Sequence, residues 1–422
     1  MTRLLLRNLD LFDPRAGALL PQREILIDGD RVVDVSQDRL GDTGASVLDL
    51  GGRAVLPGLI DCHVHVNSEA MFPHQTHETS LTDAIAYGVA RDMLLRGFTT
   101  VRDCCGADAG FREAFAQNLM PGPRLFVAID GLSQTGGHGD HRPRGDTELP
   151  RRAGSVVADG VDEVRRAVRE NLRRGADHIK IMASGGIASP TDPLEGSQYS
   201  EEEIRAATRE AARANSYVAA HAYSDDAVSR AVACGVRTIE HGSLITDRAA
   251  RVMADAGAIL VPTLSPYYWT TTRGQELGLA EHHIHKAQMT VDHSKESLAV
   301  AYRHHVKIAF GTDLFRTPKE HQAWEFLLRA DIVSPVEILR SATLIGAEVV
   351  GMSGRLGEIV PGALADLIAV DGNPLEDLGL LQEQGRHVPL ILKNGILVKS
   401  ERIDTPELLA SAGLADAVAR PH

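Results

Sequence analysis

The sequence predicts an α/β protein: a (β/α)8 barrel with a small β-sandwich domain formed by the N- and C-terminal segments. Between residues 58 and 355, eight short apolar runs alternate with helical segments, as parallel strands joined by helices do. Strand-like runs with turn signals lie both before and after this stretch. A chain of 422 residues with 43% hydrophobic content is long enough for both units.

The N-terminal part of the chain has a pattern of short strands and turns. Residues 24–28 and 31–35 are strand-like runs separated by Gly29 and Asp30, a pair typical of a hairpin turn. We therefore expect residues 1–57 to contribute strands to the small β-domain.

Eight predicted strands make up the barrel, which we assign to residues 58–355. Their apolar runs end near His65, Asp103, Ile129, Met182, His221, His241, Thr263 and Asp313. Helical segments separate them. One is expected after Ser200, a helix-capping residue that is followed by three glutamates and an Ala/Arg-rich stretch.

Strand-like runs return at the C-terminal end, at residues 356–360, 365–370 and 389–395. We expect residues 356–403 to complete the composite β-sandwich domain begun by residues 1–57. The remaining residues, 404–422, are expected to form a helical tail.

Composition excludes several classes of protein. A net charge of -13 and a pI near 5.8 argue against a nucleic-acid or anionic-membrane surface, because either needs clustered lysine and arginine. The N-terminal apolar run is too short for a signal peptide and no run is long enough to span a bilayer, which favours a cytoplasmic location. The four cysteines lack zinc-finger spacing and are expected to be small buried residues.

The end of the first barrel strand carries the most informative motif, His63-Val64-His65. Residues two apart on a strand point to the same side, so both imidazoles can share one metal ion. Further candidate ligands stand at or near the ends of later strands, where barrel enzymes place their reacting groups: Lys180, His221, His241 and Asp313. Nitrogen and carboxylate ligands without cysteine suit Zn²⁺ or another borderline divalent ion.

Lys180 does not fit this set as an ordinary lysine, because an ammonium group cannot bind a cation. It lies between Ile179 and Ile181 on a buried strand. Reaction of a neutral lysine with carbon dioxide would give a carbamate, whose two oxygens can bridge two metal ions. The alternative is a lysine that extends to solvent or pairs with a carboxylate.

These motifs resemble the amidohydrolase superfamily, in its branch with two zinc ions and a carbamylated lysine. Residues 57–65 resemble its first-strand signature, and residues 361–367 resemble its return into the β-domain. The resemblance implies that two divalent ions are held by His63, His65 and Asp313, by His221 and His241, and by a carbamate on Lys180 between them. It also implies hydrolysis by a hydroxide shared by the two ions, with Asp313 passing a proton to the leaving nitrogen.

Substrate contacts are expected from loops at the same end of the barrel. His138 lies in a glycine-rich loop after the third strand and is our candidate for polarising the scissile carbonyl, whereas His141 is expected to be an ordinary surface histidine. Tyr223 either binds a substrate carboxylate or packs under a loop. Residues 267–269, Tyr-Tyr-Trp, are more typical of a structural aromatic cluster, and Arg316 is a weaker candidate for carboxylate binding.

Within the superfamily, His138, Tyr223 and the Lys180 strand resemble the prolidase-like group, and the overall sequence resembles bacterial amidohydrolases that degrade ochratoxin A. This implies carboxypeptidase-like cleavage of N-acyl amino acids or dipeptides, with ochratoxin A split into ochratoxin α and L-phenylalanine. The expected partner is a small-molecule amide, and the family likeness suggests a homo-oligomer.

Other functions share this scaffold. A Xaa-Pro dipeptidase and a cyclic-amide hydrolase of the imidazolonepropionase kind would use the same metal chemistry. Deaminases of this superfamily usually keep one metal and lack the bridging lysine. A non-catalytic barrel scaffold protein would show gaps among the metal positions, and this sequence has none.

Overall fold

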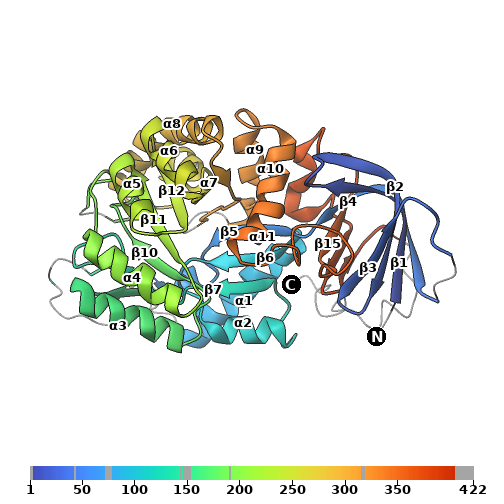
Figure 1. The fold of residues 1–422 in the computed structure, drawn as a ribbon, viewed down its shortest axis with the longest axis horizontal. Helices are drawn as coiled ribbons and strands as arrows, with labels where there is room; N and C mark the ends of the chain where they lie inside the picture. The colour runs from blue at the N-terminus through green and yellow to red at the C-terminus, as the bar shows by residue number, and fades with distance from the viewer. Residues whose placement is uncertain are drawn as a thin grey trace.

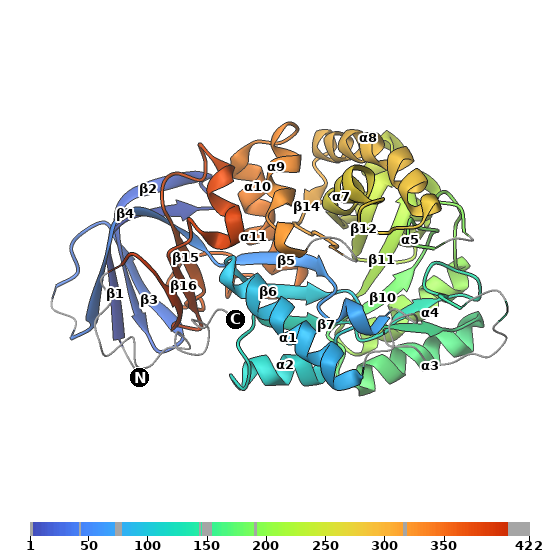
Figure 2. The ribbon, with the colours of Figure 1, turned by 180° about the vertical axis from the view of Figure 1, so that it is seen from behind.

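The computed structural model describes residues 3–41, 44–71, 78–142, 145, 154–189, 192–314 and 319–403. Figures 1 and 2 show two units side by side, a β-domain built from both ends of the chain and a larger α/β unit built from the middle. The predicted C-terminal helical tail and Arg316 lie outside the described residues.

Seven strands form the sheet of the β-domain, in the order β17-β16-β15-β4-β1-β2-β3. Their bounds are β1 (Arg3–Asp13), β2 (Ala18–Asp28), β3 (Arg31–Ser36), β4 (Ser46–Pro57), β15 (Leu367–Val370), β16 (Leu390–Lys393) and β17 (Ile396–Ser400). The predicted turn at Gly29 and Asp30 joins β2 to β3. Every strand contributes side chains to one apolar core, and Val32 of β3 bonds to Ala363 just before β15, so the sheet curls round into a sandwich.

The predicted strand at residues 356–360 is wrong. Leu356 makes one isolated bridge to Ser353, and no regular strand follows it. Gly357 has a φ of 77°, and a Cβ there would lie 2.5 Å from the carbonyl oxygen of Thr343. The chain turns at this glycine against a neighbouring backbone, and an apolar pattern cannot report such a contact.

The barrel has strands at all eight predicted positions. They are β5 (Leu59–Val64), β6 (Phe98–Asp103), β7 (Arg124–Val127) with β8 (Gly131–Ser133), β10 (Ile179–Met182), β11 (Val218–Ser224), β12 (Thr238–Leu244), β13 (Ile259–Val261) and β14 (Lys307–Ile308). The third strand is broken at Ile129, where φ is 71°, and the unpredicted β9 (Ser155–Val157) pairs with its second half. Extended backbone after β14 closes the barrel, since the Cys62 N–H donates to the Phe310 carbonyl.

Helices surround the barrel strands (Figures 1 and 2). They are α1 (Thr79–Leu95), α2 (Ala109–Ala116), α3 (Gly160–Arg173), α4 (Glu201–Arg213), α5 (Asp225–Ala233), α6 (Asp247–Ala256), α7 (Ser265–Arg273), α8 (Glu281–Arg303), α9 (Trp324–Ala330), α10 (Pro335–Ser341) and α11 (Leu344–Val349). Ser200 caps α4 as predicted, in a reciprocal capping box with Glu203.

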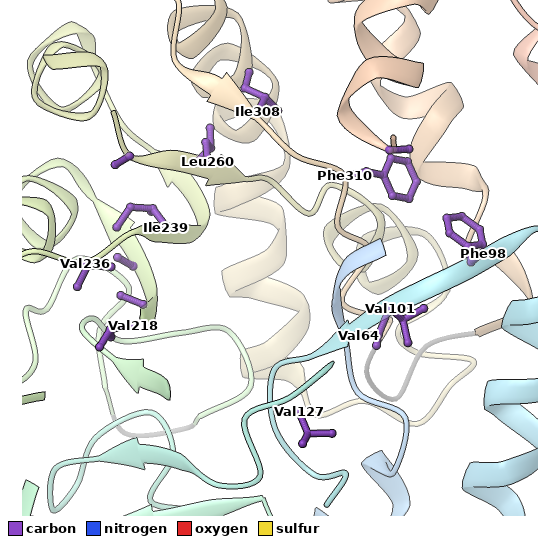
Figure 3. Packing of buried hydrophobic residues seen from close by; sticks show 14 of the residues in the cluster. Val64, Phe98, Val101, Val127, Val218, Val236, Ile239, Leu260, Ile308 and Phe310 are labelled. Carbon is purple, nitrogen blue, oxygen red and sulfur yellow. The ribbon is translucent and has the colours of Figure 1, made fainter. Parts of the chain in front are cut away.

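The main core lies between the strands and these helices. Figure 3 shows part of it, with Val101 of β6, Val218 of β11 and Ile239 of β12 among its buried apolar side chains. Polar side chains of the strands are therefore left to fill the barrel interior. Among the described helices, none is both long and apolar enough to cross a membrane.

Candidate metal centre

The six predicted metal ligands line a single cavity of about 110 Å³. They come from five barrel strands, at the carboxyl ends where the parallel strands converge: His63, His65, Lys180, His221, His241 and Asp313. The two other predicted site residues, His138 and Tyr223, line the same cavity. Residues up to 250 positions apart in sequence are thus brought together by the barrel alone.

Local backbone geometry aims two of these side chains into the barrel. Glu240 and His241 are neighbours on β12, and strict alternation would send them to opposite faces. His241 has a φ of 71°, which lets both side chains reach the interior. Asp313 has a φ of 47°, and its N–H donates to the His63 carbonyl at 2.8 Å. Such left-handed conformations are uncommon for residues other than glycine and often occur at functional sites.

A structural partner holds one nitrogen of each histidine ring. Nδ1 of His63 lies 2.8 Å from Glu240 Oε2, and Nδ1 of His65 lies 2.9 Å from the Cys105 carbonyl oxygen. The other two pairs are His241 Nδ1 with Thr263 Oγ1 at 2.8 Å and His221 Nε2 with the Gly185 carbonyl at 3.0 Å. These contacts fix the ring orientations, as the outer partners of metal-bound histidines do.

The opposite nitrogens of the first two rings approach Asp313. Its Oδ1 lies 3.6 Å from His63 Nε2 and 3.1 Å from His65 Nε2. These three residues are close enough to share one ion. The Asp313 side chain is 18% exposed, so it also faces the space that a substrate would occupy.

Burial keeps three of the rings neutral, those of His63, His221 and His241, and the neutral ring is the form that binds metal. His65 is the exception: although burial opposes it, contacts with Cys105 and Asp313 raise its pKa well above the usual value. Burial, reinforced by the charge of Lys180, lowers the pKa of His63 to about 3 and that of His241 to about 4. The pKa of His221 is also well below its usual value, mainly because of burial. Although burial opposes it, proximity to His63 and His65 holds the pKa of Asp313 well below its usual range. The residues present therefore offer three neutral imidazoles and a carboxylate, and His65 would give up its proton to a metal ion, so the set fits divalent ions.

Lys180 is only 2% exposed, so it does not extend to solvent. No carboxylate of the described residues lies within ion-pair distance of it, whereas nearby Glu240 is paired with Arg102. In the described part of the chain, Lys180 therefore neither extends to solvent nor pairs with a carboxylate, the two arrangements expected of an ordinary lysine.

His138 is held by the loop that follows β10. Its Nδ1 lies 2.7 Å from Ser189 Oγ, and this hydroxyl donates to Asp192. The ring stacks on His221 with centroids 4.2 Å apart. Gly186 permits this packing, because a Cβ there would lie 2.2 Å from His138 Cε1.

Tyr223 stacks on His241, with ring centroids 5.2 Å apart. Its hydroxyl oxygen accepts a hydrogen bond from Tyr267 at 3.0 Å, and the Tyr267 hydroxyl in turn accepts one from Ser243 at 2.9 Å. Tyr267 also lines the cavity, so it belongs to the site rather than to a separate structural cluster. Trp269 does form such a cluster, stacked on His321.

Other cavity residues were not predicted from the sequence. His141 lines the cavity, so the expectation of an ordinary surface histidine is wrong. Cys105 and His283 also line it. The apolar part of the lining includes Met71, Met182, Ile187, Pro266 and Leu279.

Comparisons with known proteins identify the family of this chain. A model of the amidohydrolase family matches residues 54–397. Ochratoxinase from Aspergillus niger is 33% identical over 370 residues, which cover 83% of this chain and 76% of that protein.

Solved structures show the same architecture. A prolidase complexed with N-methylphosphonate-L-proline superposes with a TM-score of 0.91 at 44% identity, covering 95% of this chain and all of that one. A Xaa-Pro dipeptidase with bound methionine gives a TM-score of 0.86 at 30% identity, covering 94% of this chain and 100% of that one. A. niger ochratoxinase gives 0.84 at 27% identity, covering 95% and 96%.

Proposed function

This chain belongs to the amidohydrolase family, and we propose that it is a metal-dependent amidase that releases the C-terminal amino acid from dipeptides and N-acyl amino acids, ochratoxin A included. The convergence of six ligand-type side chains on one buried cavity carries this proposal. Its similarity to an ochratoxinase and to a prolidase supports the substrate class.

Two divalent ions, with zinc as our first candidate, would be held by these ligands. His63, His65 and Asp313 would hold one ion and His221 and His241 the other, with a carbamate on Lys180 between them. When bound, such ions polarise a carbonyl and lower the pKa of water to near neutrality.

The chain's own residues would then position the substrate and move protons. Asp313 is ionised and faces the cavity, so it can accept a proton and pass it to the departing amide nitrogen. The Tyr223 hydroxyl accepts a hydrogen bond from Tyr267, so the proton of Tyr223 is left to donate to a substrate carboxylate or carbonyl. The apolar part of the cavity lining would take the acyl group and exclude water.

Metal analysis combined with a substrate panel tests this function. Zinc-replete protein would be assayed for amino-acid release from N-acyl amino acids, Xaa-Pro dipeptides and ochratoxin A, alongside Lys180→Ala. We expect the wild type to bind two ions per chain and to turn over substrate, and we expect Lys180→Ala to lose both the metal and the turnover. Protein that binds no metal and stays inactive after metal addition would instead favour a scaffold role.

A Xaa-Pro dipeptidase is the second candidate, favoured by the 44% identity to a prolidase. The same panel separates the two. A kcat/KM for Xaa-Pro dipeptides that exceeds all other substrates would assign this specialised role, whereas comparable values for phenylalanine release would assign the broader amidase. We also propose a homo-oligomer, which light scattering on purified protein would test.

A further inference from the structure

A fully buried ion pair lies behind the metal centre, between Arg102 of β6 and Glu240 of β12. Both side chains are 0% exposed. Arg102 Nη2 lies 2.8 Å from each oxygen of the Glu240 carboxylate. An isolated charge in this position would be very costly, so the pair is stable only if every polar atom has a partner.

The hydrogen bonds of this pair are fully satisfied. Arg102 directs Nε to the Cys62 carbonyl at 2.5 Å and Nη1 to Thr238 Oγ1 at 3.0 Å and Tyr217 Oη at 3.4 Å. Together with the two contacts to Glu240, all five guanidinium N–H groups have acceptors. Thr238 Oγ1 also donates to Glu240 Oε1 at 2.6 Å.

This network ends on a metal ligand. Glu240 Oε2 lies 2.8 Å from His63 Nδ1, and a carboxylate can only accept, so Nδ1 carries the proton. Nε2 of the same ring is then left with its lone pair, on the side of Asp313. Arg102 Nε also donates a hydrogen bond to the carbonyl oxygen of Cys62, the residue before His63.

We propose that Glu240 and Arg102 are positioning residues that fix His63 in the one tautomer and orientation able to bind metal. This rests on the proposed metal-dependent function. Arg102 ties its own strand, β6, to β5 and β12, because its planar fork reaches both neighbours, which the single ammonium of lysine could not do.

Glu240 is not itself a ligand in this proposal. Its oxygens lie close to His63 and Cys104, and the three groups could in principle surround an ion. A cation there would meet the Arg102 guanidinium, which already occupies both carboxylate oxygens.

The test is metal affinity, measured by competition with a chelator, together with metal content by mass spectrometry. In Glu240→Gln, an amide nitrogen facing His63 would move the ring proton to Nε2, and one facing Arg102 would repel the guanidinium. We expect metal affinity to fall roughly 10- to 100-fold. Asp366→Asn is the matched control, because it alters a buried carboxylate paired with Arg124 at the opposite end of the barrel.

The outcomes are distinguishable. Unchanged metal affinity in Glu240→Gln, or an equal loss in Asp366→Asn, would overturn the inference. If Glu240→Gln does not fold, Thr238→Val is the variant to measure, because it removes one hydrogen-bond partner of the Glu240 carboxylate and leaves no charge unpaired. Weaker metal binding by Thr238→Val supports the inference, and unchanged binding overturns it. A wild type that binds no metal would defeat the proposed function itself.

Discussion

Removing the Tyr267 hydroxyl should weaken catalysis only through Tyr223. The hydrogen-bond chain runs from Ser243 to Tyr267 at 2.9 Å and from Tyr267 to Tyr223 at 3.0 Å, so it aims the Tyr223 proton at the cavity. Burial raises the pKa of both tyrosines, so both hydroxyls stay protonated at neutral pH.

The expected magnitudes follow from the charge of the acceptor. A hydrogen bond to a charged group contributes about 1.5–3 kcal/mol, so Tyr223→Phe should lower kcat/KM roughly 10- to 150-fold, mostly through KM. Tyr267→Phe removes only the neutral bond that orients Tyr223, about 0.5–1.5 kcal/mol, which corresponds to roughly 2- to 12-fold.

A double-mutant cycle on amino-acid release from an N-acyl amino acid measures the coupling. Once Tyr223 has been replaced by phenylalanine, the further change Tyr267→Phe should cost almost nothing. Tyr302→Phe, on helix α8, is the control for removing a partly buried phenol elsewhere. If Tyr267→Phe costs as much in the Tyr223→Phe background as in the wild type, the orienting role is refuted.

Three further predictions concern other parts of the molecule. Asp313→Asn should lower kcat roughly 10²- to 10⁴-fold in metal-loaded protein, and retention of the full rate would contradict its role in proton transfer. Gly186→Ala should displace the His138 ring and lower kcat/KM roughly 100-fold, and steady-state kinetics together with a crystal structure would check this. His178 stacks on Tyr217 and has no hydrogen-bond partner among the described residues, and burial lowers its pKa. The stability of the fold is therefore undiminished above pH 6.5 and falls as the pH drops below that value, because the unfolded chain then binds a proton at His178 that the folded chain does not. His178→Phe should therefore raise the Tm more at pH 5 than at pH 8, by an amount equivalent to roughly 2 kcal/mol, and an equal change at both pH values would refute it.

The barrel and its family could be predicted because the same sequence pattern, a short apolar run followed by a helical segment, repeats along the chain. Each strand is a short apolar run, and the residues that follow it meet at one end of the barrel whatever lies between. His63, His65 and Asp313 could thus be placed together from the sequence alone, and the structure brings them within ion-sharing distance. The resemblance to amidohydrolases is confirmed by the family match.

The surroundings of the site could not be predicted, because they depend on contacts between distant elements. Glu240 stands in an apolar run beside His241, and only the left-handed backbone at His241 shows that both point inward. Tyr267 lies on α7 and His141 on a loop, and the sequence does not show that either side chain turns toward the cavity. A charged residue within a strand-like run, such as Arg102 or Glu240, is the kind of sequence signal that could have pointed to the network behind the ligands.

The composite sheet has a consequence for synthesis on the ribosome. β4 pairs with β15, from Pro57 with Leu367 to Ala54 with Val370, across a span of about 300 residues. At translation rates of 5–20 residues per second, the N-terminal strands wait roughly 15–60 s for this partner. Throughout that time β4 has an unpaired edge able to join another nascent chain. Sparse polysomes, which keep nascent chains apart, should therefore improve the soluble yield more than stabilising the finished fold would.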